Sequence, residues 1–351
     1  MNNHSHRVTM QDIADALGIS LVTVWKVMNN RAGVSDSLKG RIIAKAAELG
    51  YTHSAAVTLS SHDYEEKSSV SLIVSRPESS LFWTGMIHRI AKEFTHRNIN
   101  LVYTYVPSFY RIGYQLPAIL NPQSVQGIII MNVYDEAMLR LINTLPIPKV
   151  FLDTVTSIPS YELAGDLVLL EGRNSIREIT DHIISQGRTN LGFIGDIRYA
   201  RTNYERYIGF EESLSAHKIP IRAENCMTQG LGIYDYYEKI SCFLGRIQKM
   251  PDAFVCASDY VAHFLLYYLN GQGYKVPQHV AVSGYDGNSE YGISEDILTT
   301  VPVNTDALGK LLVRELLFRM ENPESPYEVD YVNVHVRYGS STCIRPDSDV
   351  L

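Results

Sequence analysis

The chain has 351 residues, which is too long for one ordinary hydrophobic core and predicts two or three domains. Its formal net charge of −7 argues against a protein that coats nucleic acid with its whole surface. The four cysteines lack metal-ligand spacing, and neither a signal peptide nor a run of about 18 apolar residues occurs, so we expect free thiols, no metal or cofactor, and a cytoplasmic protein without a membrane span.

The first predicted elements are two short helices within residues 11–30, separated by a turn at Gly18. Thr9 is placed to cap the first helix and Ser20 to cap the second, and glycine permits the sharp turn between them. This is the layout of a helix-turn-helix, which sets its second helix in the major groove of DNA. The pattern therefore indicates a protein that finds its targets on DNA.

The second helix has an unusual outward face. Val24 and Val27 have the spacing of a buried face. The side chains left pointing outward are Leu21, Val22, Trp25, Lys26 and Asn29. Apolar groups at such positions can meet the methyl groups of thymine. A third helix, between Ser35 and Gly50, completes a three-helix core; the alternative is a small helical bundle without a role on DNA.

Charge is distributed unevenly along the chain. Residues 1–61 carry six Lys and Arg against four Asp and Glu, whereas the remainder carries 25 against 34. The mildly basic residues 1–61 are called the head below, and the acidic remainder is called the body. This combination is typical of a DNA-reading module attached to a part that does not touch DNA. Because the charge of the head is small, a single copy should bind weakly, and we expect a homodimer.

The body alternates between short β-branched runs and amphipathic helical patterns. A polar stretch at 60–69 marks the boundary before it. The alternation predicts parallel sheets flanked by helices, and this length accommodates two sheets with a cleft between them. The predicted strands are 70–74, 127–131, 149–152, 191–194, 253–257 and 280–283, and the predicted helices are about 85–97, 136–145, 175–186, 204–217, 234–247 and 260–272.

Several short motifs follow one another in order from the end of the head through the body. Among them are Glu48-Leu-Gly-Tyr51, Arg206-Tyr-Ile-Gly-Phe210, Cys256-Ala-Ser-Asp259 and Val282-Ser-Gly-Tyr-Asp286. Together with the helix-turn-helix they resemble the LacI/GalR family of bacterial transcription regulators over essentially the whole chain. The resemblance implies an N-terminal all-α helix-turn-helix head and an α/β, periplasmic-binding-protein-like core of two Rossmann-like lobes, which dimerises and answers a small effector.

The resemblance also implies a division of the chain. We expect a DNA-binding domain at 1–50, a hinge at 51–68, a core at 69–346 and a tail at 347–351. Within the core, the first lobe is expected at about 69–168 and 299–325, and the second at about 169–298 and 326–346.

The family pattern implies a set of DNA contacts, and this chain departs from that pattern at two places. The implied contacts are Thr9, Ser20, Leu21, Val22, Thr23, Trp25, Lys26, Asn29 and Leu59. The family carries Ser-Arg where this chain has Trp25-Lys26, and lysine cannot make the bidentate contact with guanine, so we expect reading through methyl groups and shape. Leu59 is the expected minor-groove wedge of the hinge, although it comes about one residue early.

Two charged residues lead the effector candidates. Arg206 opens a predicted helix, where a guanidinium fork can grip adjacent hydroxyls or a carboxylate; the alternative is an exposed helix arginine. Asp286 directly follows a predicted strand, where its carboxylate can accept hydrogen bonds from a polyol; the alternative is a local Asx turn. The matching family positions contact effector.

Further effector candidates match cleft positions of the family: Phe82, Trp83, Asp153, Glu171, Ser258 and Asp259. Trp83 is the better stacking candidate, since core packing explains Phe82 equally well. Asp259 has a second explanation as a helix cap, and Glu171 and Ser258 stand where family members more often carry Asp and Asn.

The sequence favours a transcription repressor whose effector, a sugar first and a nucleoside or purine second, binds between the lobes. A small-molecule binding protein without a DNA role is the alternative. An enzyme is disfavoured, because no GxGxxG after a strand, GxSxG elbow or P-loop occurs, so no catalytic residue is expected. The sequence leaves open the operator, the sign of the response, and a dimer against a tetramer.

Overall fold

The computed structural model describes residues 8–28, 31, 33–49, 51, 68–75, 81–231, 235–287 and 297–343. The chain divides into two compact units, Met1–Lys67 and Ser68–Leu351. Two of the expected DNA contacts, Asn29 and Leu59, lie outside the described residues.

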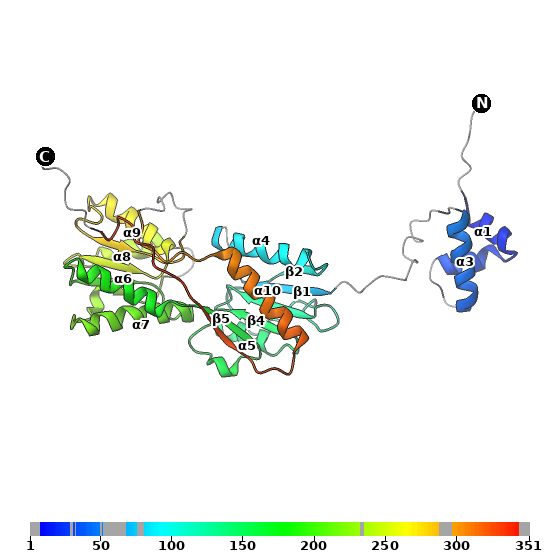
Figure 1. Ribbon diagram of the computed structural model, residues 1–351, viewed down its shortest axis with the longest axis horizontal. Coiled ribbons are helices and arrows are strands. Elements are labelled where there is room, and N and C mark those ends of the chain that lie inside the picture. The colour runs from blue at the N-terminus through cyan, green and yellow to red at the C-terminus, as the bar shows by residue number, and fades with distance from the viewer. Residues whose placement is uncertain are drawn as a thin grey trace, which may run out of the picture. The chain divides into compact units, whose positions relative to one another are not determined.

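The first unit contains the three predicted helices, α1 (Met10–Leu17), α2 (Leu21–Met28) and α3 (Asp36–Leu49) (Figure 1). Thr9 and Asp12 form a reciprocal capping box at the start of α1. Gly18 ends α1 with a φ of 64°, a left-handed conformation that glycine adopts without strain. The buried core is Ile13, Ala14, Val24, Val27, Met28, Ile42 and Ala46. The predicted inward face of α2, with Val24 and Val27, is confirmed.

The second unit holds two parallel sheets, each covered by helices on both faces. The first has the strand order β10-β5-β4-β3-β1-β2. Its strands are β1 (Ser69–Val74), β2 (Asn100–Tyr105), β3 (Gly127–Met131), β4 (Lys149–Leu152), β5 (Asp166–Leu170) and β10 (Val329–Val332). Helices α4 (Leu81–Thr95) and α10 (Thr305–Glu321) pack on one face and α5 (Glu136–Asn143) on the other. Burial of both faces explains continuous apolar runs such as Gly127–Met131.

The second sheet has the order β7-β6-β8-β9. Its strands are β6 (Leu191–Ile194), β7 (Cys226–Met227), β8 (Ala253–Cys256) and β9 (Ala281–Ser283). Helices α6 (Arg173–Ser185) and α7 (Arg201–Ala216) cover one face, and α8 (Tyr236–Leu244) and α9 (Asp259–Gly271) cover the other. Short 3-10 turns lie at Ser160–Glu162 and Ala223–Asn225. All four cysteines are free, as expected.

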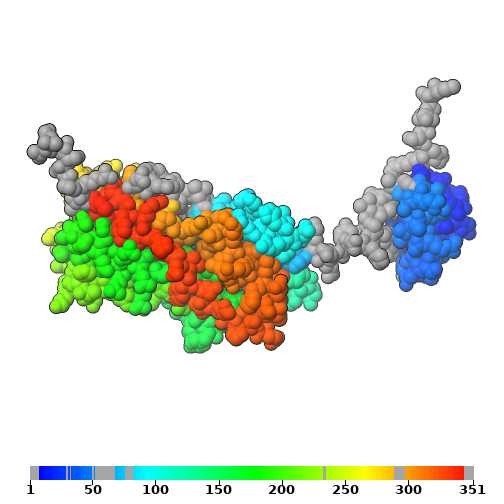
Figure 2. All heavy atoms as spheres, in the orientation of Figure 1, coloured from blue at the N-terminus to red at the C-terminus, as the bar shows by residue number. Residues whose placement is uncertain are grey.

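The lobes exchange segments at places that differ from the expected boundaries. The strand β10 pairs in parallel with β5 in the first sheet, so 329–332 belong to the first lobe and not to the second. Conversely, Thr299 and Thr300 bridge to Ser283 and Arg337 in the second lobe. Figure 2 shows the residues after α10, in red, lying across the surface of both lobes. The strand with which each segment pairs, and not its local sequence, decides the lobe to which the segment belongs.

Membrane and metal features can be stated for the described part of the chain. There, no helix is both long and apolar enough to span a bilayer. Likewise, no group of three His, Cys, Asp or Glu side chains in that part could hold a metal ion.

A buried ion pair fixes the segment that returns from α10 to the first sheet. Arg319 is 2% exposed and donates from Nε and Nη2 to the two carboxylate oxygens of Asp166, at 2.8 and 2.7 Å. The same guanidinium donates to the carbonyl oxygen of Ser325 at 2.5 Å, and the Glu328 N–H donates to Asp166 Oδ1 at 2.9 Å. The pair therefore holds the chain at the start of β10.

Removing one partner of this pair should be costly. We expect Arg319→Met to destabilise the core by about 3–5 kcal/mol, because it leaves the Asp166 carboxylate buried without its cation. The midpoint of urea unfolding measures the loss. Adding Asp166→Asn, which keeps the acceptor for Glu328, should recover part of it. A loss below about 1 kcal/mol in the single variant would contradict the assigned role.

Candidate functional site

The helix α2 presents an apolar surface beside a basic group. Leu21, Val22 and Trp25 are 43, 61 and 45% exposed, whereas Val24 and Val27 are buried. Lys26 is half-buried on the same helix. A water-exposed patch of three apolar side chains on one short helix is unusual for a surface that only meets solvent. Its place on the second helix of a helix-turn-helix suits contact with base edges.

The polar candidates of the head are engaged within it. The Thr9 hydroxyl donates to Asp12 Oδ2 at 2.7 Å as part of the capping box. The Ser20 and Thr23 hydroxyl oxygens lie 2.8 Å apart, and the Thr23 N–H donates to Ser20 Oγ at 3.2 Å. These side chains hold the start of each helix, so their first role is to position α1 and α2.

In the core, Arg206 is the centre of a cluster at the junction of the lobes. It lies on α7, is 4% exposed, and stacks on the Tyr285 ring with 3.5 Å between the guanidinium carbon and the ring centroid. Its Nη1 donates to the carbonyl oxygen of Ala257 at 2.6 Å, and its Nη2 lies 3.8 Å from Asp286 Oδ1. The exposed-arginine alternative is therefore wrong, and Arg206 and Asp286 lie together as expected.

The motif that carries Arg206 also has a packing role. A side chain at Gly209 would place its Cβ 2.1 Å from the carbonyl oxygen of Arg173. Glycine therefore allows α7 to approach the first turn of α6. This close approach fixes where Arg206 enters the cluster.

Asp153 comes from the first lobe and is held by the second. It directly follows β4, is 7% exposed, and accepts hydrogen bonds from the Thr202 hydroxyl at 2.5 Å and the Thr202 N–H at 3.3 Å. Burial raises the pKa of Asp153, and these hydrogen bonds act in the opposite direction. Asp153 thus links β4 to the first turn of α7.

Asp153 and Asp286 also share a rare backbone conformation. Their φ angles are 64° and 105°, a region that residues other than glycine seldom adopt. Such conformations tend to gather at functional sites, where the surrounding structure fixes them. Both residues lie at the carboxyl ends of strands, which is where open α/β sheets bind ligands.

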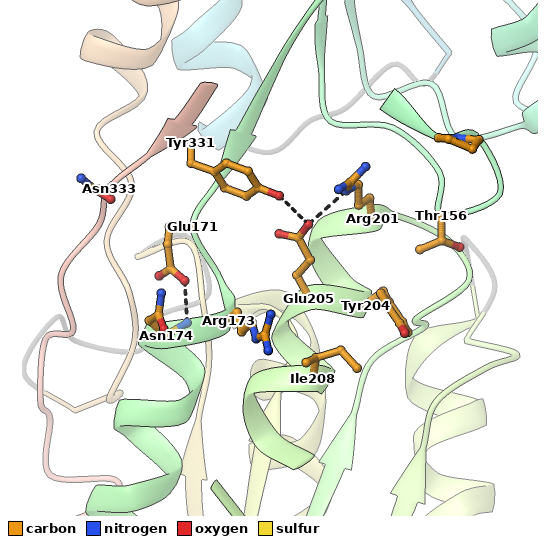
Figure 3. Close-up of a pocket in the computed structure, with 11 residues that line it drawn as sticks. Thr156, Glu171, Arg173, Asn174, Arg201, Tyr204, Glu205, Ile208, Tyr331 and Asn333 are labelled. Carbon is orange, nitrogen blue, oxygen red and sulfur yellow. Dashed lines mark hydrogen bonds and ion pairs between the residues drawn. The ribbon is translucent and has the colours of Figure 1, made fainter. Parts of the chain in front are cut away.

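Three other candidates have structural roles. Ser258 caps α9, accepting from the Val261 N–H at 3.2 Å. Asp259 is 1% exposed and accepts from the Thr300 hydroxyl at 2.6 Å, so it is a buried partner of Thr300 and not the cap. Glu171 accepts from the Asn174 N–H at 2.5 Å and so caps α6 (Figure 3).

The aromatic candidates pack on the first lobe. Phe82 and Trp83 lie edge to face with 5.0 Å between ring centroids. Both are half-buried against the apolar cluster between α4, α10 and the first sheet. The alternative of core packing for Phe82 is confirmed, and Trp83 shares this packing.

Comparison with known proteins adds two matched regions and full-length relatives. Residues 9–54 match the bacterial regulatory proteins of the lacI family, and residues 180–342 match a periplasmic binding protein-like domain. The head is thus a lacI-family helix-turn-helix domain and the core is a periplasmic-binding-protein-like domain, as the sequence motifs indicated. This combination of domains identifies a DNA-binding transcription regulator.

Individual transcription regulators align along nearly the whole chain. The HTH-type transcriptional repressor PurR of Glaesserella parasuis is 26% identical over 91% of this chain and 92% of its own. The fold is shared with a transcriptional regulator CelR–cellobiose complex (TM-score 0.66, 21% identity, 95% of this chain and 100% of that chain). It is also shared with the lac repressor dimer bound to operator and the anti-inducer ONPF (TM-score 0.65, 19% identity, 96% and 100%).

Within the core, sequence reasoning missed two members of the cluster. Thr202 precedes Arg206 by four residues and so shares its face of α7, a spacing that was available in the sequence. Tyr285 precedes Asp286, and its hydroxyl donates to the carbonyl oxygen of Glu171 at 2.6 Å. Only the fold reveals that its ring lies under the Arg206 guanidinium.

The titration of Asp286 gives a measurable consequence. Burial raises the pKa of Asp286 to about 7, with the charge of Asp259 adding to the shift and Arg206 opposing it. An unfolded aspartate titrates near 3.9, so between about pH 4 and pH 7 the folded state binds more protons than the unfolded state. The contribution of Asp286 to stability is therefore full below about pH 4 and is lost as the pH rises toward 7.

Replacing Asp286 should flatten this dependence. We expect the unfolding free energy of Asp286→Asn to fall less than that of the parent between pH 4 and 7, by at most about 1.4 kcal/mol per pH unit. Urea unfolding at pH 4.5 and 7.5 measures the difference. Glu324→Gln, at an exposed position, is the control. Equal slopes for parent and Asp286→Asn would refute the raised pKa.

Proposed function

We propose that this protein is a dimeric repressor that reads a pseudo-palindromic operator through α2 and answers a neutral polar effector, a sugar, bound at the Arg206 cluster. The observation that carries the DNA part is the exposed Leu21, Val22 and Trp25 surface on a capped helix-turn-helix. The full proposed set of DNA contacts is Thr9, Ser20, Leu21, Val22, Thr23, Trp25, Lys26, Asn29 and Leu59. Reading by apolar contact favours operator half-sites rich in thymine.

The effector part of the proposal rests on the chemistry of the lobe junction. Arg206 and Asp286 offer donors and acceptors from the second lobe, and Asp153 offers a carboxylate from the first. Among the described residues, Arg206 Nε is buried without a hydrogen-bond partner, which leaves a donor for a ligand. Groups of both signs close together suit hydroxyls, which donate and accept. The structure of CelR with cellobiose, which shares this fold, supports the same ligand class.

A dimer and a cytoplasmic location follow from the DNA role. The head carries only six basic against four acidic residues, so two heads on one operator would supply the affinity that one lacks. The lac repressor structure with operator is described as a dimer. A two-fold dimer reads two half-sites related by the same symmetry. Operator DNA lies in the cytoplasm of a bacterium, so we place the protein there.

Selection of bound sequences from random duplex DNA by the full-length protein tests this function. The experiment is done at a stated near-physiological salt, because phosphate contacts make affinity depend on salt. We expect a pseudo-palindrome to be enriched, and sugars added to the complex to change its stability. Failure to enrich any motif, with and without sugars, would reject the regulator in favour of a binding protein.

A further inference from the structure

A cavity of about 720 Å³ lies beside the Arg206 cluster but on another face of α7. Arg201, Tyr204, Glu205 and Ile208 line it, at a spacing that places them on one side of the helix (Figure 3). Thr202 and Arg206 lie about 100° further round the helix, since each residue turns an α-helix by about 100°. The cavity is therefore distinct from the proposed effector site.

The opposite walls of the cavity come from both lobes. Thr156 follows β4 in the first lobe, and Tyr331 lies on β10, which runs from the first sheet toward the second lobe. The Tyr331 hydroxyl donates to Glu205 Oε1 on α7 at 2.9 Å. A ligand in the cavity would contact elements of the two lobes at once. Its volume is that of a site for a small molecule.

The charged side chains that line the cavity already have partners. Arg201 Nε donates to Glu205 Oε1 at 3.0 Å, and Arg173 Nε donates to Glu212 Oε2 at 2.9 Å. Glu171 is occupied by the backbone N–H groups of α6. Since each of these charges already has a partner, a charged ligand would gain less here than beside an unpaired charge. The charge pattern therefore favours a neutral ligand.

The neutral polar groups are available instead. Within the described residues, the side chains of Thr156, Asn174 and Asn333 line the cavity without a hydrogen bond to the protein. The rings of Tyr204 and Tyr331 are 41 and 46% exposed and offer flat apolar faces. Amides and hydroxyls match sugar hydroxyls, and aromatic faces match the C–H face of a sugar ring. The geometry points to a second site, in this cavity lined by both lobes, for a neutral mono- or disaccharide.

Calorimetric titration of the full-length protein tests this site. The titrated protein, called the background protein, carries Arg206→Met, which disables the Arg206 cluster. The probes are the neutral sugars glucose, ribose and cellobiose. Glucuronate and glucosamine serve as their charged matches. We expect at least one neutral sugar to bind the background protein more tightly than either charged match. Tyr204→Ala with Asn333→Ala should weaken that binding at least about tenfold.

The control is Tyr161→Ala, because Tyr161 is 85% exposed and does not line the cavity. It should leave the binding of the sugar unchanged, and all variants should keep the far-ultraviolet circular dichroism of the parent. The site is rejected if no neutral sugar binds the background protein, if Tyr204→Ala with Asn333→Ala has no effect, or if a charged match binds best. Operator selection by the parent protein is independent of these outcomes, so the site can fail while the regulator stands.

Discussion

Replacing Arg206 with methionine is expected to weaken effector binding about 100-fold while leaving operator affinity without effector within about threefold of the parent. The guanidinium is buried against Tyr285, donates to the carbonyl oxygen of Ala257 and lies beside Asp286. Its loss removes a preformed charged donor and leaves the Asp286 carboxylate without its nearest cation. Truncating one member of such a buried pair costs about 2–5 kcal/mol of binding. Calorimetric titration with the effector sugar and anisotropy with labelled operator measure the two affinities.

Two further variants separate this effect on effector binding from general damage to the core. Arg206→Lys keeps the charge but loses the planar fork of the guanidinium, so its affinity for effector should lie between those of the parent and Arg206→Met. Arg198→Met removes an exposed arginine just before α7 and should bind effector like the parent. If Arg206→Met responded to effector normally, the junction cluster would not be the effector site. If it lost operator binding as well, Arg206 would act on the whole fold.

The head was predictable because its signals are local. The Thr9 capping box, the Gly18 turn and the apolar faces of the helices act within a few residues, and each appears in the structure where the sequence placed it. The buried strands β3 and β4 were equally clear, since a short apolar run buried on both faces has few other uses in an α/β chain.

The strands β5 and β10 escaped prediction for physical reasons. Asp166–Leu170 is a five-residue run whose first residue is a buried aspartate, explained only by Arg319 far away in the sequence. Val329–Val332 is half-exposed and includes Asp330, so its strand conformation depends on pairing with β5. The helix α10 was missed as well. Non-local pairing also set the lobe boundaries.

The candidate site was likewise only partly predictable from the sequence. Strand ends could be located in the sequence, which is why Asp153 and Asp286 were found. Ser258 and Glu171 occupy similar positions, yet their side chains cap the helices that follow. Sequence position cannot distinguish a carboxylate that turns to its own helix from one that faces the other lobe.

Replacing the thymines of the selected operator half-sites with uracil is expected to reduce specific affinity by about tenfold to a hundredfold. Uracil lacks only the 5-methyl group, and burying one such group is worth about 0.8 kcal/mol, or about fourfold in affinity. The exposed Leu21, Val22 and Trp25 side chains offer several contacts of this kind in each half-site, and a dimer doubles them. Anisotropy titration of paired thymine and uracil duplexes measures the difference.

The salt dependence provides the internal control, because both duplexes keep every phosphate and should show the same slope of log affinity against log salt. A protein with Val22→Ser and Trp25→Ala should bind the thymine operator less tightly and should no longer distinguish it from the uracil operator. Lys26→Ala should instead weaken both duplexes equally. Equal binding of thymine and uracil by the parent would mean that α2 reads polar base edges, and Lys26 would then have to supply the specificity that its apolar neighbours do not.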